Sequence, residues 1–272
     1  MHWMPAVRLS ILPVALLAAC NNQAVPEPAN NMATPAPATV AATPESKPKP
    51  FVYDVQNELI EFHYGWSAEA AAVPQLVARF RNEMEKAEAE LLAGAKDDKA
   101  SRDRQGFDFH GYMSSTEYET GGQSERLLSL RVDAGSFTGG AHGNHGTGSL
   151  LWDRQANREI KNTDLFANAA NRDRLLIQRW CDALNKAREE KRGEPVGGGG
   201  MFDDCPKLDE IAIVPTDKDK NGRFELLTLV ASPYVAGPWV EGSYEIELPV
   251  TSDLIAGLKS DYRTGFEVPQ VQ

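Results

Sequence analysis

A glycine-rich segment holds the side chains of this sequence that are best suited to recognition or chemistry. It reads Gly139-Gly140-Ala141-His142-Gly143-Asn144-His145-Gly146. Glycines allow positive φ and close backbone approach, so a loop here could present its polar side chains to a glycan or a protein. Two histidines three residues apart could also begin a zinc site, although no third ligand lies nearby in the sequence. A structural turn, with His142 bonded to backbone groups, is the third interpretation. The candidate binding residues are Phe137, Gly139, Gly140, His142, Asn144 and His145.

A second candidate segment is Asp217-Lys218-Asp219-Lys220-Asn221-Gly222. Oxygen-bearing side chains at alternate positions with glycine sixth resemble the first half of a calcium loop. The twelfth position is Thr228, where such loops carry a bidentate glutamate. The flanks are strand-like, so a hairpin turn between Val214 and Phe224 explains these residues more simply. We therefore expect no metal and no cofactor.

Two aromatic residues, Tyr234 and Trp239, lie among prolines and glycines in an expected connecting segment. Such rings can stack on a sugar or anchor a protein interface. The alternative is that they pack into the domain, and for Tyr234 this is what the family resemblance described below implies.

Recognisable catalytic motifs are absent from the sequence: there is no Gly-x-Ser-x-Gly elbow, phosphate loop or dinucleotide fingerprint. Linear spacing also gives no pair of carboxylates that must share a cleft, as glycosidase chemistry requires. We expect no catalytic residues. The alternative is a peptidoglycan hydrolase or deacetylase that uses His142 or His145.

The composition favours a folded, acidic protein. The 272 residues are 42% hydrophobic, which is enough for a sizeable core. Lys and Arg total 28 against 39 Asp and Glu, a formal charge of -11. This charge argues against nucleic acid as a partner and fits a basic protein or a neutral glycan.

The N-terminus has the order of a secretory signal. Arg8 precedes an apolar run over residues 9–19, which is too short to span a bilayer. Leu17-Ala18-Ala19-Cys20 resembles the bacterial lipobox, so we predict a lipoprotein signal peptide over 1–19 and attachment of lipid, including palmitate, at Cys20. An ordinary cleaved signal is the alternative.

Residues 20–50 are rich in proline and alanine and predict an extended tether. Asn21 is not the aspartate associated with inner-membrane retention. In a Gram-negative host we therefore expect a periplasmic domain that is anchored in the outer membrane through its lipid.

Two cysteines, Cys181 and Cys205, remain after Cys20, and in an oxidising compartment we expect them to form a disulfide. A pair of buried free thiols is the alternative.

Hydrophobic periodicity predicts one α+β domain over 51–272, or two subdomains divided near 150–160. Its mainly antiparallel sheet packs with two amphipathic helices, one after Ser67 and one over 168–192. The first strand is expected at 60–66, a turn at Glu119–Gly122 and a glycine-rich turn at 139–148. Further strands are expected at 128–132, 149–152, 211–214, 226–230 and 246–250.

Three segments resemble one known family. They are Ser136–Gly143, Asp164–Phe166, and Pro233–Pro238 followed by Tyr244–Pro249. Together they are similar to signature segments of the domains shared by the RsiV-type anti-sigma factor ectodomain and the accessory region of the peptidoglycan deacetylase PdaC. The resemblance spans about Val52 to Leu258.

The resemblance implies an α+β fold and an extracytoplasmic role near the cell wall, and the best-known member of the family binds lysozyme. We do not expect the sigma-factor signalling or the metal-dependent deacetylation of those relatives, since the sequence shows neither of the segments responsible. The function we predict is a non-catalytic lipoprotein that binds a lysozyme-like enzyme or peptidoglycan through Phe137–His145.

Overall fold

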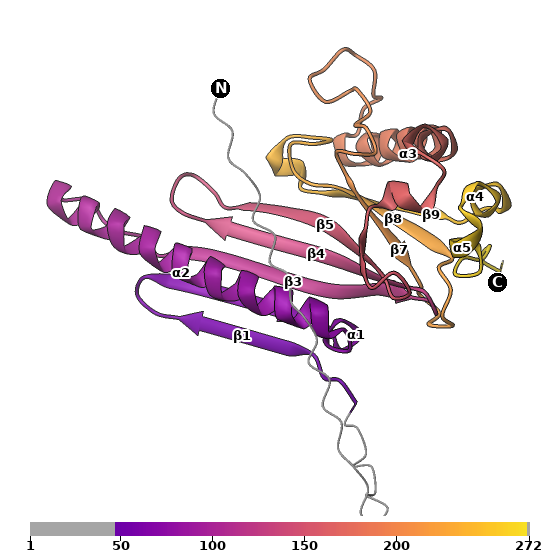
Figure 1. The fold of residues 1–272 in the computed structure, drawn as a ribbon. Helices are drawn as coiled ribbons and strands as arrows, with labels where there is room; N and C mark the ends of the chain where they lie inside the picture. Colours follow the sequence, from indigo (N-terminus) through magenta and orange to yellow (C-terminus); the bar gives the residue numbers. More distant parts are fainter. Residues whose placement is uncertain (1–46, 271–272) are drawn as a thin grey trace, which may run out of the picture. The chain divides into compact units, whose positions relative to one another are not determined.

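The computed structural model describes residues 47–270, which lie in one compact unit (Figure 1). Within these residues the strands form two sheets. The larger sheet has the order β1-β2-β3-β4-β5-β6, and only the β2–β3 pair is parallel. Its strands are β1 (Phe51–Gln56), β2 (Ile60–Trp66), β3 (Tyr112–Gln123), β4 (Leu127–Phe137), β5 (Asn144–Asp153) and β6 (Arg158–Ile160).

The smaller sheet is antiparallel, in the order β7-β8-β9. Its strands are β7 (Ala212–Thr216), β8 (Leu226–Ala231) and β9 (Tyr244–Pro249). The predicted α+β class with a mainly antiparallel sheet is confirmed.

The two expected amphipathic helices are α2 (Pro74–Gln105) and α3 (Ala169–Arg192). Short helical segments complete the described part of the chain: α1 (Ala68–Ala71), η1 (Asn162–Leu165), η2 (Trp239–Glu241), α4 (Ser252–Gly257) and α5 (Ser260–Arg263). None of the helices described here is both long enough and apolar enough to cross a membrane.

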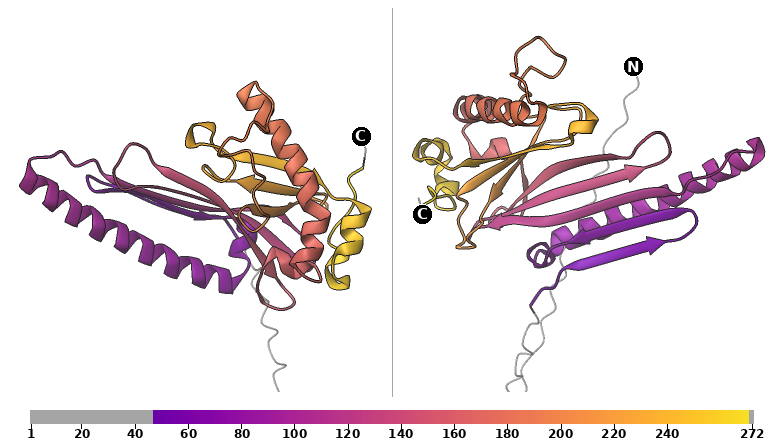
Figure 2. Two further views of the ribbon diagram at one scale, coloured as in Figure 1. Left: turned by 90° about the horizontal axis from the view of Figure 1, so that it is seen from above. Right: turned by 180° about the vertical axis from the view of Figure 1, so that it is seen from behind.

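The elements stack in layers (Figure 2). The long helix α2 covers one face of the larger sheet, with Phe80 and Leu76 fully buried against it. On the opposite face lies the smaller sheet, whose strand β7 contacts β3, β4 and β5, and α3 covers its outer side. Two hydrophobic clusters result, one beneath α2 and one beneath α3.

The beginning of the domain differs from the prediction in two ways. A strand, β1, precedes the expected first strand and pairs with it antiparallel, using the alternation of Phe51, Tyr53 and Val55. Ser67 caps the short α1, because its Oγ accepts from the Ala70 amide, and the long helix starts afresh at Pro74. Proline fits the first turn of a helix, where its missing N–H has no partner to lose.

The predicted turn at Glu119–Gly122 is wrong, since β3 runs through it to Gln123 with an irregularity between Thr120 and Gly122. A Cβ at Gly121 would lie 2.6 Å from Val214 Cγ1, so glycine is needed there for β7 to approach. The chain turns instead before Leu127, whose amide donates to Ser124 Oγ. Strand β5 likewise begins at Asn144, inside the glycine-rich segment that was expected to turn as far as 148.

The cysteine pair is bonded as predicted. Cys181, on α3, forms a disulfide with Cys205, 24 residues further along the chain. Beside it the Trp180 indole N–H donates to the Pro206 carbonyl at 3.2 Å. Cys20 and the predicted signal peptide lie outside the described residues.

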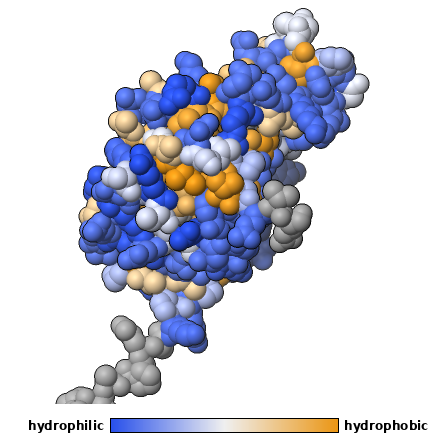
Figure 3. Space-filling view, turned by 90° about the vertical axis from the view of Figure 1, so that its right-hand side faces the viewer, coloured by the Kyte–Doolittle hydropathy of each residue, from blue (hydrophilic) through white to orange (hydrophobic). Residues whose placement is uncertain are grey.

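The end of the molecule that carries α4 and α5 has a mostly hydrophilic surface with a group of hydrophobic side chains near its middle (Figure 3).

Candidate functional site

The glycine-rich segment forms the tip of the β4–β5 hairpin. Ser136 pairs with Asn144 and Gly135 with His145, so the strands are in register up to the turn. Gly139 and Gly140 have φ of 98° and 102°, which L side chains rarely adopt. The glycines therefore have a structural role, and they place the histidines at the surface, where both His142 and His145 are exposed.

The tip meets the connection between β8 and β9. The His142 ring stacks on Trp239 with a centroid distance of 4.3 Å, and its Nε2 lies 3.3 Å from the Tyr234 hydroxyl. The Trp239 indole N–H donates to the Gly143 carbonyl at 3.2 Å, and His145 approaches the same indole edge-on at 6.4 Å. We call His142, His145, Tyr234 and Trp239 the histidine–aromatic surface.

A second set of hydrogen bonds joins the same two segments beside this surface. Ser232 Oγ accepts from the Thr147 amide at 3.0 Å, and the Thr147 hydroxyl donates to Asp133 at 2.6 Å. Arg131 then links Asp133 to Glu245 on β9. The larger and the smaller sheet are therefore connected where the surface lies.

Tyr234 has a left-handed backbone with φ of 70°, which is uncommon for a residue other than glycine. Its amide donates to the Gly237 carbonyl at 2.9 Å, so the strained conformation closes a tight turn. Tyr234 as a whole is 55% exposed, and Val240 on the same connection is 84% exposed. The expectation that Tyr234 packs inside the domain is wrong.

The C-terminal end of α3 holds this connection from beneath. Arg188 is fully buried and donates to the Ala236 carbonyl at 2.9 Å and to the Asp204 carbonyl at 3.0 Å. Lys191 donates to the Glu241 and Ser243 carbonyls at 2.8 and 2.9 Å. Charged donors on a rigid helix thus fix the backbone that carries Trp239.

An ion pair between α3 and Glu241 also holds the β8–β9 connection. Arg192 binds both oxygens of Glu241 at 3.0 and 3.1 Å. Burial alone would raise the pKa of Glu241, but hydrogen bonds from Arg192 and Tyr244 outweigh it and lower this pKa. Burial, together with the bond to Glu241, raises the pKa of Tyr244 to about 12.

The other predicted residues of the hairpin surround the surface without joining its contacts. Phe137 ends β4 opposite Met113, and the Asn144 side chain is exposed at the start of β5. A Cβ at Gly139 would lie 3.5 Å from Arg102 Nη2, so the other side of the tip faces the end of α2.

Among residues 47–270, neither His142 nor His145 has the partners of a catalytic base or a zinc ligand. In the described chain, the hydrogen bonds of His142 go to Gly143 and Tyr234, and neither ring contacts a carboxylate. The one group of three possible metal ligands found among residues 47–270 is Asp217, Asp219 and Glu225, on another loop.

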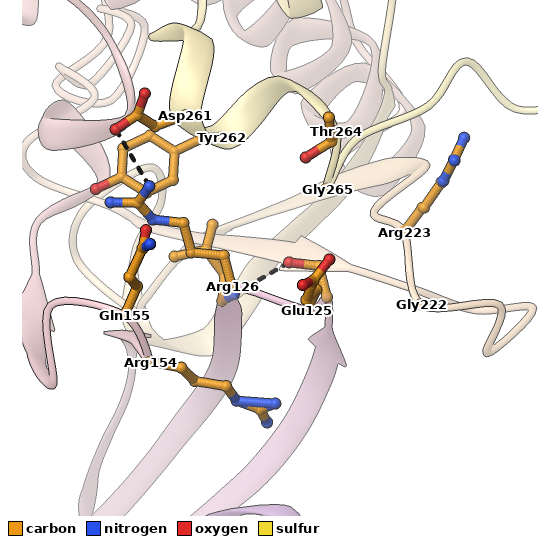
Figure 4. Close-up of a pocket in the computed structure, with 12 residues that line it drawn as sticks. Glu125, Arg126, Arg154, Gln155, Gly222, Arg223, Asp261, Tyr262, Thr264 and Gly265 are labelled. Atoms are coloured by element: carbon orange, nitrogen blue, oxygen red, sulfur yellow. Dashed lines mark hydrogen bonds and ion pairs between the residues drawn. The ribbon is translucent and has the colours of Figure 1, made fainter.

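A pocket between the β3–β4 turn and α5 has a structural explanation (Figure 4). Arg126 binds the buried Asp153 at 3.0 Å and Asp261 at 3.2 Å, and it lies over the Tyr262 ring. Asp153 also accepts from the amides of Gln155 and Ala156, which closes the turn before β6. The contacts of Arg126 and Asp153 thus hold a turn and α5 to the larger sheet.

Sequence reasoning missed the arginine and lysine anchors of the surface. The signal for Arg188 is present in the sequence, because it continues the four-residue spacing of Leu176, Trp180 and Leu184 along the buried side of α3. Periodicity alone predicts an apolar residue at such a position, and the buried arginine departs from that rule.

Fold and surface together define a class: an α+β domain with an exposed histidine–aromatic surface where its two sheets are linked. Residues 54–145 match the family model described as Deacetylase PdaC, a family of extracytoplasmic domains. The resemblance predicted from the sequence is thereby confirmed, and the matched segment includes the whole β4–β5 turn.

Solved structures give two further similarities. A DUF3298-family member from Bacteroides fragilis is 16% identical with a TM-score of 0.46, over 80% of this chain and 96% of that one. A DUF3298-family protein from Pseudomonas aeruginosa is 15% identical with a TM-score of 0.40, over 78% and 94% respectively. No curated protein matches the chain.

Proposed function

We propose that this protein is a non-catalytic, lipid-anchored binding protein of the cell envelope whose partner is a basic, lysozyme-like enzyme. The observation that carries the proposal is the contact between two segments far apart in the sequence. The stack of His142 on Trp239 joins the β4–β5 turn to the β8–β9 connection and leaves Tyr234 exposed beside it. Exposed aromatic side chains on a fixed backbone are typical anchors of protein interfaces.

Charge supports a basic partner. The chain has a formal charge of -11, so a cationic enzyme would be attracted before contact and the association rate should fall as salt rises. Peptidoglycan is the other wall-related ligand, and an aromatic surface suits sugar rings as well. A neutral glycan would show little dependence of its association rate on salt, which separates the two ligands.

The first experiment measures binding of the full-length protein, in detergent, to a basic lysozyme and to purified peptidoglycan at about 50 and 300 mM salt. We expect saturable lysozyme binding that His142→Ala and Tyr234→Ala each weaken about fivefold to thirtyfold, the range of moderate interface anchors. The matched controls are His110→Ala and Phe107→Ala, because both side chains are exposed and belong to the segment after α2, outside the histidine–aromatic surface.

No lysozyme binding at tens of micromolar in low salt would contradict the proposed partner. Binding that is weakened equally by the control variants would contradict the proposed surface. Incubation with muropeptides tests the non-catalytic part, since any enzymatic turnover of product would rule it out.

The proposed lipid anchor at Cys20 is tested separately by membrane fractionation. Cys20→Ala should release the protein from membranes, because the apolar run before it is too short to hold the chain in a bilayer. Unchanged membrane association of this variant would contradict the lipid anchor while leaving the binding surface untouched.

A further inference from the structure

The loop between β7 and β8 brings three acidic side chains together. Asp217, Asp219 and Glu225 each offer a carboxylate oxygen, and these oxygens lie within 4.8 Å of one another. Asp217 and Glu225 are each only 8% exposed. Among residues 47–270 none of the three forms an ion pair, so their negative charges face one another without a cation. Such an arrangement is costly unless a cation neutralises it.

One oxygen of this group is also left unsatisfied. Glu225 Oε1 accepts from the Lys218 amide at 2.7 Å, whereas Glu225 Oε2 is buried without a hydrogen-bond partner. An unpaired charged oxygen that is more than nine-tenths buried is rare in native proteins and needs an explanation. A metal ion bound between the three carboxylates would supply one.

We propose that Asp217, Asp219 and Glu225 form a calcium-binding site. The ligands are all oxygens, which selects a hard cation, and a loop with several carboxylates suits the six to eight ligands that calcium takes. Water and backbone carbonyls of the loop can complete the shell. The Asn221 side chain is engaged within the loop, since its Oδ1 accepts from the Arg223 amide at 2.9 Å and its Nδ2 donates to Asp219 at 3.0 Å.

The hairpin expected from the sequence is present, and it is compatible with the ion. Asp217 Oδ2 accepts from the Gly222 amide at 3.0 Å and Oδ1 from the Asn221 amide at 3.1 Å, so this carboxylate is already oriented. The twelfth residue, Thr228, is committed to β8 and bonds Thr216 at 2.8 Å. Calcium loops of this pattern carry a bidentate glutamate at the twelfth position. Here Glu225, at the ninth position, would supply that carboxylate.

Calorimetry on the full-length protein, after removal of metals with EDTA, tests the site directly. Titration with CaCl2 should give one saturable event with a Kd between about 10⁻⁴ and 10⁻³ M, the range of extracellular calcium modules. At 10 mM Ca²⁺ the Tm should rise by about 3 to 10 °C. Mg²⁺ should bind more weakly, because it demands a stricter octahedron.

Three variants locate the ion. Asp219→Asn and Glu225→Gln should each weaken Ca²⁺ binding about tenfold or more. Asp219 is exposed, and the amide oxygen introduced by Glu225→Gln can still accept from the Lys218 amide, so the metal-free Tm of both variants checks that they fold. Asp97→Asn removes an equally exposed charge on α2 and should bind Ca²⁺ as the natural protein does.

The absence of saturable heat and of a Tm shift at 10 mM Ca²⁺ would overturn the proposal. So would tighter binding of Mg²⁺, or calcium binding that Asp219→Asn and Glu225→Gln leave unchanged.

Discussion

The two regions of this domain are stabilised in different ways. The region of β1–β6 and α2 has an aromatic core, in which Phe80 stacks on Tyr118 at 3.9 Å and lies 5.8 Å from Trp66. The region of β7–β9 and α3 buries two arginines, Arg172 and Arg188, and contains the disulfide. Aromatic packing follows from strand and helix periodicity, whereas buried polar contacts depend on particular partners.

The candidate surface combines both kinds of support. The first region contributes a hairpin tip fixed by strand register, and the second contributes a connection fixed by charged donors on α3. Substitutions in the region of β7–β9 and α3 should therefore lower both the stability of the domain and its binding through the histidine–aromatic surface.

Arg188→Met should destabilise the protein by about 3 to 5 kcal/mol. The buried carbonyl of Ala236 and the partly buried carbonyls of Asp203 and Asp204 would lose their donor, and each loss of a buried partner costs roughly 1–3 kcal/mol. Urea denaturation measures the change, with Arg174→Met, an exposed position on the same helix, as the control. Equal midpoints for the two variants would show that α3 does not hold the connection as described.

Loss of the disulfide should cost about 3 kcal/mol in the chain-entropy view, since the bond joins residues 24 apart. The double variant Cys181→Ser, Cys205→Ser, compared with the natural protein in urea, measures this cost. We also expect weaker binding through the histidine–aromatic surface, because Arg188 donates to carbonyls in the loop that the disulfide fixes. Equal stability of the double variant and the natural protein in urea would contradict a stabilising role for the disulfide.

Asp153→Asn should destabilise the contact between the two regions by about 2 kcal/mol at neutral pH, the scale of hydrogen bonds to a charged group. Burial would raise the pKa of Asp153, but bonds from the Ala156 amide, Arg126 and Tyr262 outweigh it and lower this pKa. The stabilisation is therefore present above the unfolded pKa and is lost as pH falls through the folded one. Stability curves for both proteins between pH 7 and pH 2 should converge at the acid end, and a constant difference would contradict the assignment.

His63→Gln should have the smallest effect, below about 1 kcal/mol, because the side chain is 38% exposed and its partner Asp54 is 67% exposed. Hydrogen bonding to Asp54, with a smaller contribution from Glu117, raises the pKa of His63. The stabilisation is present below the unfolded pKa of the ring and disappears as pH rises through the folded one. Thermal melts at pH 5.5 and pH 8.5 should differ between the two proteins only at the lower pH. A difference that is larger at pH 8.5 would contradict this sign.

Much of the fold could be predicted because its periodic segments follow local rules. Alternation over Ile60–Trp66 and the helical spacing that ends at Arg192 both predict elements close to those observed. The turn expected at Glu119–Gly122 is wrong because glycine serves there for close approach of β7, a tertiary reason that a local pattern does not contain.

The candidate site could be predicted only in part. The glycine-rich turn with its two histidines follows from residue type and spacing. Its contact with Trp239 does not, because Gly143 and Trp239 are 96 residues apart and only the packing of the two sheets unites them. The buried Glu225 oxygen likewise becomes visible only once its surroundings in the fold are known.

Hydrogen exchange of the full-length protein, with and without a basic lysozyme, tests whether the β4–β5 turn and the β8–β9 connection form one binding surface. Amides of 137–147 and of 232–243 should become protected together on binding, while those around Phe107 should not change. Protection confined to one of these segments, or found only elsewhere, would contradict a single binding surface.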